Sequence, residues 1–209
     1  MFSFIDVEQN SSEWFQLRAG KLTSSKLGTI MANFSKAFGE PAKKYAVNIA
    51  IEQITGEPIP STFTNAHMER GHEQEPIARR LYEDATFADV TNGGFFESDF
   101  VGCSPDGLVY DDGVIEIKSV IAPVHFANVK RGTVDPAYYW QCVGNLKFTG
   151  RDWLDFISYC SEFPEDRQIY THRIYAKNLD AEFNKINERI AEFKQLVTKS
   201  KEIILNSNY

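Results

Sequence analysis

The segment 102–118 constrains the fold more than any other part of this 209-residue chain. It contains a Pro-Asp-Gly bend at Asp106, an Asp-Asp-Gly turn that ends at Gly113, and then an alternating run of β-branched and charged residues. Such alternation is typical of a strand with one buried face. Because side chains two positions apart in a strand share a face, Glu116 and Lys118 point the same way. The segment therefore predicts a β-hairpin with charges on one side.

The turn decides which residues face each other across this hairpin. If 111–113 is a three-residue loop with its glycine in the left-handed conformation, Asp106 faces Lys118. Asp106 and Glu116 are then diagonal neighbours, about 7 Å apart at the backbone. Two carboxylates at that separation repel each other unless a hard cation lies between them, and Mg²⁺ prefers oxygen ligands. A two-residue loop would put Asp106 on the other face, and the alternative interpretation is a surface hairpin with scattered charges.

Composition places the chain among ordinary soluble globular proteins. Its length suits one domain spanning residues 1–209, with a hydrophobic content of 43% and a charged fraction of 24%. No apolar run reaches the length of a membrane span, and the acidic N-terminus does not resemble a signal peptide, so we expect a cytoplasmic protein with no membrane partner. The net charge of −7 argues against a general nucleic-acid coating protein, although bound Mg²⁺ would reverse the sign locally.

The cysteines and histidines show no metal-ligand spacing. The three cysteines are widely separated and form no CxxC pair, which predicts reduced thiols instead of disulfides or a zinc site. The four histidines are similarly scattered, and we interpret them as structural. The candidate chemistry therefore depends on carboxylates and lysine.

Helical and strand patterns surround the hairpin. Helices are predicted at about 11–20, 23–27, 41–56, 65–84, 124–129, 135–148 and 178–205, and further strands at about 87–90, 94–97, 100–103, 153–159 and 168–175. We expect the three strands before the hairpin to form an antiparallel meander with it. This order predicts an α/β (α+β) domain with a central mixed sheet flanked by helices.

Two helical positions carry candidate functional groups. Glu75 falls on the inward stripe of helix 65–84, where an unpaired carboxylate is costly, so a metal shared with Asp106 and Glu116 would give it a partner. The alternative is an exposed glutamate on the neighbouring helix face. The start of segment 23–27 offers free N–H groups and a positive dipole to a phosphate, with simple capping as the alternative.

Together these motifs resemble known nucleases. Pro105-Asp106 followed by Glu116-Ile117-Lys118 resembles the PD-(D/E)xK nucleases, which implies a restriction-endonuclease-like core. From about residue 11 to the last helix, the chain resembles the phage-type 5′→3′ exonucleases of the lambda exonuclease family, also called YqaJ-like viral recombinases. The matching segments are Trp…Leu-Arg-x-Gly…Thr-x-Ser in 13–25, Gly-x-x-x-Glu in 70–75, Cys-Ser-Pro-Asp-Gly in 103–107 and Glu-x-Lys in 116–118.

The resemblance implies a two-metal site. Asp106 and Glu116 would bind two Mg²⁺ ions, for which Mn²⁺ can substitute. The backbone carbonyl of Ile117 would add a ligand, and Glu75 would act through the second metal or its waters.

The resemblance also implies groups that act on water and on the DNA end. Lys118 would orient and activate the attacking water, with Gln141 beside it. Arg18, Ser25 and Ser104 match the residues that bind the 5′-phosphate in this family. Met68 falls at the position of an apolar residue that wedges between the terminal bases.

As a whole, the resemblance implies a Mg²⁺-dependent exonuclease that degrades one strand of linear duplex DNA from 5′-phosphorylated ends. It would release mononucleotides and leave a 3′ single strand for a single-strand annealing partner. The family also implies a ring-shaped homotrimer, encoded by a phage or prophage, in the cytoplasm of a bacterial host. Two alternatives are a PD-(D/E)xK endonuclease of repair or restriction type and a non-catalytic DNA-end-binding module. The intact acid–acid–lysine set argues against the module.

Overall fold

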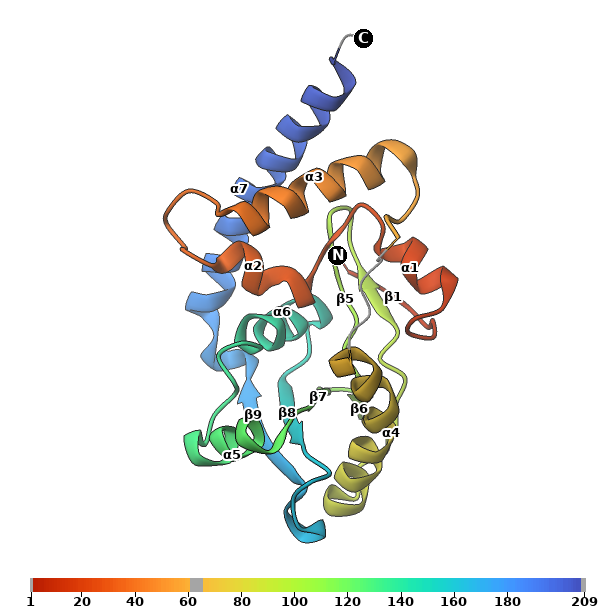
Figure 1. Ribbon diagram of the computed structural model, residues 1–209, viewed down its shortest axis with the longest axis vertical. Helices are drawn as coiled ribbons and strands as arrows, with labels where there is room; N and C mark the ends of the chain where they lie inside the picture. Colours follow the sequence, from red (N-terminus) through yellow and green to blue (C-terminus); the bar gives the residue numbers. More distant parts are fainter. Residues whose placement is uncertain (1, 61–65, 208–209) are drawn as a thin grey trace.

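The computed structural model describes residues 2–60 and 66–207, with only the backbone of residues 66–68 (Figure 1). Its helices are α1 Ser12–Arg18, α2 Leu27–Met31, α3 Glu40–Thr55, α4 Ala66–Thr86, α5 Ala122–Arg131, α6 Tyr139–Thr149 and α7 Asp180–Leu205, with short 3₁₀ turns η1 Ser24–Lys26, η2 Glu165–Arg167 and η3 Ala176–Asn178. Its strands are β1 Ser3–Ile5, β2 Leu22–Thr23, β3 Val90–Thr91, β4 Phe95–Glu97, β5 Val101–Cys103, β6 Gly107–Val109, β7 Gly113–Ser119, β8 Trp153–Tyr159 and β9 Ile169–Tyr175.

A mixed five-stranded sheet contains the predicted hairpin. Its order is β3-β6-β7-β8-β9; β7 and β8 run parallel, and the other neighbouring pairs run antiparallel. On one face, Ile115 and Ile117 pack with Tyr82 of α4. On the other face, Val114 packs in a core with Leu146 of α6. The predicted fold class, a mixed sheet flanked by helices, is confirmed.

A second, four-stranded sheet was not predicted. Its order is β1-β4-β5-β2, so β4 and β5 do not join the hairpin, and the expected meander is wrong. Of the strands that precede the hairpin in the described chain, only β3 pairs with it, through β6. Gly93 and Gly94 turn the chain from one sheet towards the other, and Gly94 has φ +53°. Gly93 approaches Pro105 so closely that a Cβ would lie 1.7 Å from its carbonyl oxygen.

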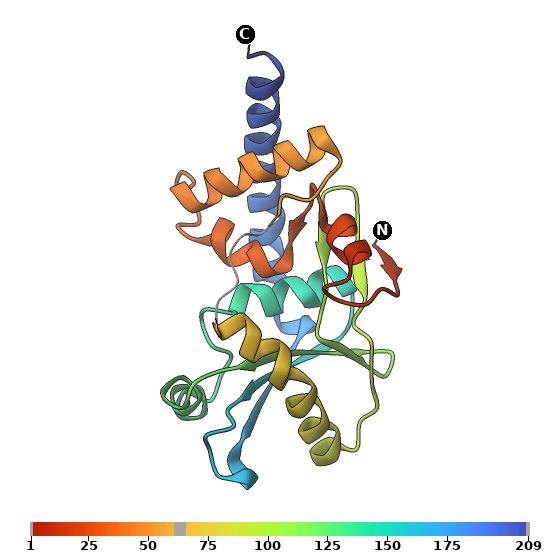
Figure 2. The same ribbon diagram turned by 45° about the vertical axis from the view of Figure 1, so that its right-hand side comes forward.

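The last helix packs on the core, as predicted. Its residues Ile186, Phe193 and Val197 are buried in the main core, and α7 crosses α3 in both views (Figures 1 and 2). The C-terminal end of α7 projects beyond the body of the molecule. None of the described helices is both long enough and apolar enough to span a bilayer.

The cysteines agree with the prediction, whereas the start of helix α6 does not. The three cysteines are free thiols, as predicted, and all three are buried. Helix α6 begins at Tyr139 instead of the expected Asp135. The Asp135 carboxylate accepts a hydrogen bond from the N–H of Ala137 at 2.9 Å, within a turn that precedes the helix. The acid therefore stabilises a turn before the helix starts.

Candidate active site

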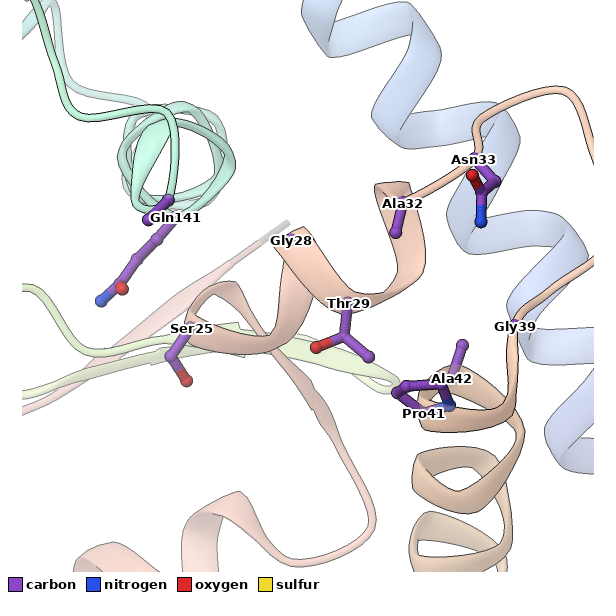
Figure 3. Close-up of a pocket in the computed structure, with 10 residues that line it drawn as sticks. Ser25, Gly28, Thr29, Ala32, Asn33, Gly39, Pro41, Ala42 and Gln141 are labelled. Atoms are coloured by element: carbon purple, nitrogen blue, oxygen red, sulfur yellow. The ribbon is translucent and has the colours of Figure 1, made fainter. Parts of the chain in front are cut away.

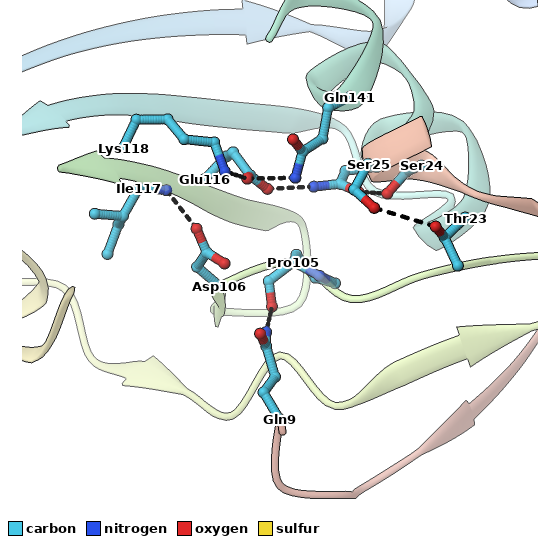
Figure 4. Close-up of polar contacts among 11 residues, drawn as sticks. Gln9, Thr23, Ser24, Ser25, Pro105, Asp106, Glu116, Ile117, Lys118 and Gln141 are labelled. Carbon is cyan, nitrogen blue, oxygen red and sulfur yellow. Dashed lines mark hydrogen bonds and ion pairs between the residues drawn. The ribbon is translucent and has the colours of Figure 1, made fainter. Parts of the chain in front are cut away.

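The Pro-Asp-Gly bend places Asp106 directly before β6. Its N–H donates to the carbonyl of Ile115 at 3.1 Å, and its carboxylate accepts from the N–H of Ile117 at 2.6 Å (Figure 4). Contacts with the residues on both sides of Glu116 fix Asp106 alongside that glutamate. The hairpin therefore brings the two predicted metal-binding acids together.

The predicted turn geometry, however, is wrong. Tyr110 is the left-handed residue, with φ +49°, and Gly113 already pairs within β7. A Cβ on Gly113 would lie 2.1 Å from the Trp153 ring, so close packing is what requires glycine there. The register consequently differs by two residues, and Asp106 does not face Lys118. Since side chains on a strand repeat every two residues, this slip keeps the acidic pair on one face.

Glu116 is fully buried and is held by three donors. The Nζ of Lys118 lies 2.5 Å from Oε1, the Gln141 amide donates to Oε1 at 2.5 Å, and the Asn145 amide donates to Oε2 at 2.7 Å. Burial, followed by the charge of Asp106, raises the pKa of Glu116 to about 8. Both carboxylate oxygens are therefore oriented by the protein.

Lys118 is a charged donor at this site. Burial lowers its pKa, but the charges of Glu116 and Asp106 outweigh burial and raise the pKa above its usual range. Its Nζ also lies 5.1 Å from the ring centroid of Tyr138. The side chain is thus held as an ammonium beside the two acids.

Glu75 projects inward from α4, as its place on the helix stripe predicted. It is half-buried, and burial followed by the charge of Asp106 raises the pKa of Glu75 to about 7. Glu75, Asp106 and Lys118 line one cleft of about 700 Å³. Glu75 and Asp106 also line a hollow of about 400 Å³ beside Asn10. The acids therefore lie between two openings.

The donor set fits a divalent cation. Burial raises the pKa of Asp106, Glu75 and Glu116 alike, and a cation among these oxygens would offset their repulsion. Among the described side chains, those of residues 2–60 and 69–207, no three acidic, histidine or cysteine groups form a ready-made metal cage. We therefore expect the acids to draw together around a bound ion. Ile117 reaches Asp106 through its N–H, and its carbonyl as a metal ligand stays a prediction.

Arg18 and Ser104 are linked through Trp14. The Arg18 guanidinium stacks 3.9 Å from the Trp14 ring centroid, and the indole N–H donates to the Ser104 hydroxyl at 2.9 Å. That hydroxyl donates its proton to the carbonyl of Gly94 at 2.5 Å. No carboxylate of the described chain lies within ion-pair distance of Arg18. Arg18 is therefore the group of this pair that can donate to an anion.

Ser25 lies on η1 beside a different cleft. Its exposed hydroxyl is 3.1 Å from that of Thr23, and with Gln141 it lines a cleft of about 440 Å³. Figure 3 shows Ser25 and Gln141 at one end of this cleft and Pro41, at the start of α3, at the other. Between Ser25 and Arg18, both in the described part, no direct hydrogen bond is present. The side chain of Met68 lies outside the described residues.

Two residues of the site were not predicted, and each lies one helical turn from a predicted one. Asn145 is four positions after Gln141, and Arg79 is four positions after Glu75. Arg79 donates to the backbone carbonyl of Asp106, and its charge opposes the rise in the pKa of Glu75. Residues at i and i+4 share a helix face. That spacing could have identified both.

Comparison with known proteins agrees with the fold. The YqaJ-like viral recombinase domain family matches residues 13–152. An alkaline exonuclease from Laribacter hongkongensis, LHK-Exo, is 32% identical with a TM-score of 0.77, over 93% of this chain and 98% of that chain. The structure of LHK-Exo in complex with dAMP has the same identity and coverage and a TM-score of 0.79.

A more distant structure shares the fold alone. A phage related exonuclease from Haemophilus somnus 129PT is 18% identical with a TM-score of 0.66, over 90% of this chain and 96% of that chain. The comparison with curated proteins found no match. Because the family match covers most of the chain, including the hairpin and helices α4 and α5 beside the 700 Å³ cleft, this protein belongs to the family of YqaJ-like viral recombinase domains.

Proposed function

We propose that this protein is a Mg²⁺-dependent 5′→3′ exonuclease that degrades one strand of linear duplex DNA from 5′-phosphorylated ends and releases mononucleotides. The observation that supports this most is the gathering of Asp106, Glu116 and Lys118 on one hairpin, with Glu75 at the same cleft. Membership of a viral recombinase family and the similarity to an alkaline exonuclease support the nuclease role.

The side chains fit in-line hydrolysis of a phosphodiester. Asp106 and Glu116 would hold two Mg²⁺ ions, with Mn²⁺ as a substitute, and the bound ions would activate water and stabilise charge on the phosphoryl and leaving oxygens. Lys118 orients the attacking water with its ammonium, and Gln141 fixes Glu116. Water adds to phosphorus, and the bond to the 3′-oxygen of the terminal nucleotide breaks. That oxygen takes up a proton.

End selection would depend on Arg18. Its guanidinium, held on Trp14 beside Ser104, can donate two hydrogen bonds to a terminal phosphate, and Ser25 would add a hydroxyl. Each cut leaves a new 5′-phosphate on the shortened strand, so this site is filled again after every step. The complex of LHK-Exo with dAMP supports a mononucleotide as the product.

The assembly and partners remain proposals based on the family resemblance. A homotrimeric ring around duplex DNA would keep the enzyme on one molecule between cuts. A single-strand annealing protein would take the 3′ strand that the reaction leaves. A cytoplasmic location in a bacterial host is part of the same proposal.

Digestion of two DNA forms tests the function. Linear duplex with 5′-phosphates and covalently closed circles are incubated with Mg²⁺, and the products are separated by chromatography. We expect mononucleotides from linear DNA and intact circles. Asp106→Ala should abolish digestion, whereas Asp99→Ala, at an exposed turn, should not. Cut circles would favour an endonuclease of repair or restriction type, and no cutting with Mg²⁺ or Mn²⁺ would leave the DNA-end-binding module.

A further inference from the structure

A buried hydrogen-bond chain joins Glu116 to the segment that carries Ser25. The Asn145 amide nitrogen donates to Oε2 of Glu116 at 2.7 Å, and the Ser24 hydroxyl donates to the Asn145 amide oxygen at 2.5 Å. Glu116 and Asn145 are 0% exposed, and Ser24 is 3% exposed. Ser24 is the first residue of η1, and Ser25 follows it. Water therefore cannot replace either bond without opening the core.

The chemistry of the three groups fixes the direction of both bonds. In its ionised form, which the ion pair with Lys118 favours, the carboxylate of Glu116 can only accept. Asn145 must therefore turn its NH₂ towards Glu116, which leaves its carbonyl oxygen for a donor. Ser24 is that donor. Without the hydroxyl, a buried carbonyl oxygen loses its partner, and the amide loses the group that selects its orientation.

Close packing between α6 and η1 makes this chain of bonds possible. A Cβ on Gly144 would lie 2.2 Å from Leu27 and 3.1 Å from the Cβ of Ser24. Glycine at this position therefore lets the two segments approach. Figure 4 shows Ser24, Ser25 and Thr23 on one side of Glu116 and Lys118 on the other. The contact is thus a built feature of the fold.

We propose that Asn145 is a positioning residue that aims the Glu116 carboxylate at the metal, and that Ser24 anchors it. The inference rests on the proposed function, since it assumes that Glu116 binds a metal. Partners outside the ligand set typically change metal affinity about 10–100-fold when they are removed.

Isothermal titration of DNA-free protein with Mn²⁺ tests this role. Asn145→Leu should weaken Mn²⁺ binding about 10-fold or more. Ser24→Ala should weaken it about 3- to 10-fold, although its side chain touches no carboxylate. The double variant should bind no more weakly than Asn145→Leu alone, because Ser24 acts through Asn145. Asn128→Leu is the matched control, since it removes a fully buried asparagine that bonds to Ser158 instead.

The outcomes separate this inference from a general loss of stability. Thermal unfolding is recorded for every variant, and Ser24→Ala keeps the test open if Asn145→Leu does not fold. Wild-type Mn²⁺ affinity in folded Ser24→Ala and Asn145→Leu would overturn the proposal, as would an equal loss in Asn128→Leu. If the losses in Mn²⁺ binding free energy of the two single variants simply add in the double variant, the anchoring role of Ser24 is overturned. A wild type that digests linear DNA while Asn145→Leu binds Mn²⁺ normally would sink this inference and leave the proposed function standing.

Discussion

The Nζ of Lys118 lies 2.5 Å from Oε1 of Glu116, two positions earlier on the same strand. Both residues lie on β7, so the strand places the ammonium and the carboxylate on the same face of the sheet. We expect Lys118→Met to lower kcat about 10²- to 10⁴-fold, with little change in KM, because the neutral side chain cannot orient the attacking water. Initial rates on linear DNA measure this. Lys147→Met, which removes another half-buried lysine, should keep near-normal rates.

Divalent metal should stabilise the folded protein through its acids. At a concentration 100 times Kd, Mg²⁺ or Mn²⁺ should add about 2.7 kcal/mol to the free energy of unfolding. Asp106→Asn should lose most of this gain, because one ligand is removed and the local repulsion is already relieved. Scanning calorimetry with metal and with EDTA measures the effect, and Asp99→Asn is the control. An unchanged gain in Asp106→Asn would place the metal elsewhere.

Arg18 should matter far more for phosphorylated ends than for hydroxyl ends. Loss of charge-assisted hydrogen bonds in Arg18→Ala should slow digestion of 5′-phosphorylated duplex about 10- to 100-fold. Digestion of the same duplex with 5′-hydroxyl ends should change much less. Arg80→Ala, on the exposed side of α4, should affect neither substrate. Equal losses on both substrates would assign Arg18 to structure alone.

Gly113 should not tolerate a side chain. A Cβ there would lie 2.1 Å from the Trp153 ring, so we expect Gly113→Ala to reduce the free energy of unfolding by about 1–3 kcal/mol. Gly28 offers a comparison, because a Cβ on it meets no atom within 4 Å. Gly28→Ala should therefore change stability by less than about 1 kcal/mol. Urea unfolding of both variants measures the difference.

His125 should make stability fall in acid. It is buried, with Nδ1 2.9 Å from the Ser158 hydroxyl and Nε2 3.2 Å from the carbonyl of Arg167. Burial lowers the pKa of His125 below its usual value of 6.5, so the unfolded chain binds the proton first. Its contribution is fully present above about pH 6.5 and is lost as the pH falls towards the folded-state pKa. Urea unfolding across this range should show a flatter decline for His125→Gln, and an equal decline would contradict the assignment.

The sequence predicted side-chain faces better than pairings. The common face of Asp106 and Glu116 and the inward position of Glu75 follow from the two-residue strand repeat and the 3.6-residue helix repeat, which are written in the chain itself. The hairpin register was wrong because Gly113 is required by Trp153, forty positions later, and not by the turn. A local pattern carries no information about such a contact.

The same difference decides which residues of the candidate site could be predicted. Asn145 and Arg79 could have been predicted, because each lies one turn from a predicted residue on the same helix face. The hydrogen bond between Trp14 and Ser104 could not have been predicted from local patterns, since it joins residues ninety positions apart in the sequence. Strands β4 and β5 were predicted, but their partners β1 and β2 are only three and two residues long, too short for alternation to identify them, so the second sheet was missed.

Residues 104–106 form the link by which the chain leaves the four-stranded sheet and enters the five-stranded one. Gln9 donates to the carbonyl of Pro105 at 2.9 Å, and Arg79 of α4 donates to the carbonyl of Asp106. Two segments that are distant in the sequence therefore hold this link by hydrogen bonds. The distance between Ser104 and Asp106 therefore depends on the relative position of the two sheets that this link joins. We therefore expect substitutions that tilt one sheet against the other to slow the proposed DNA cleavage before they unfold either sheet.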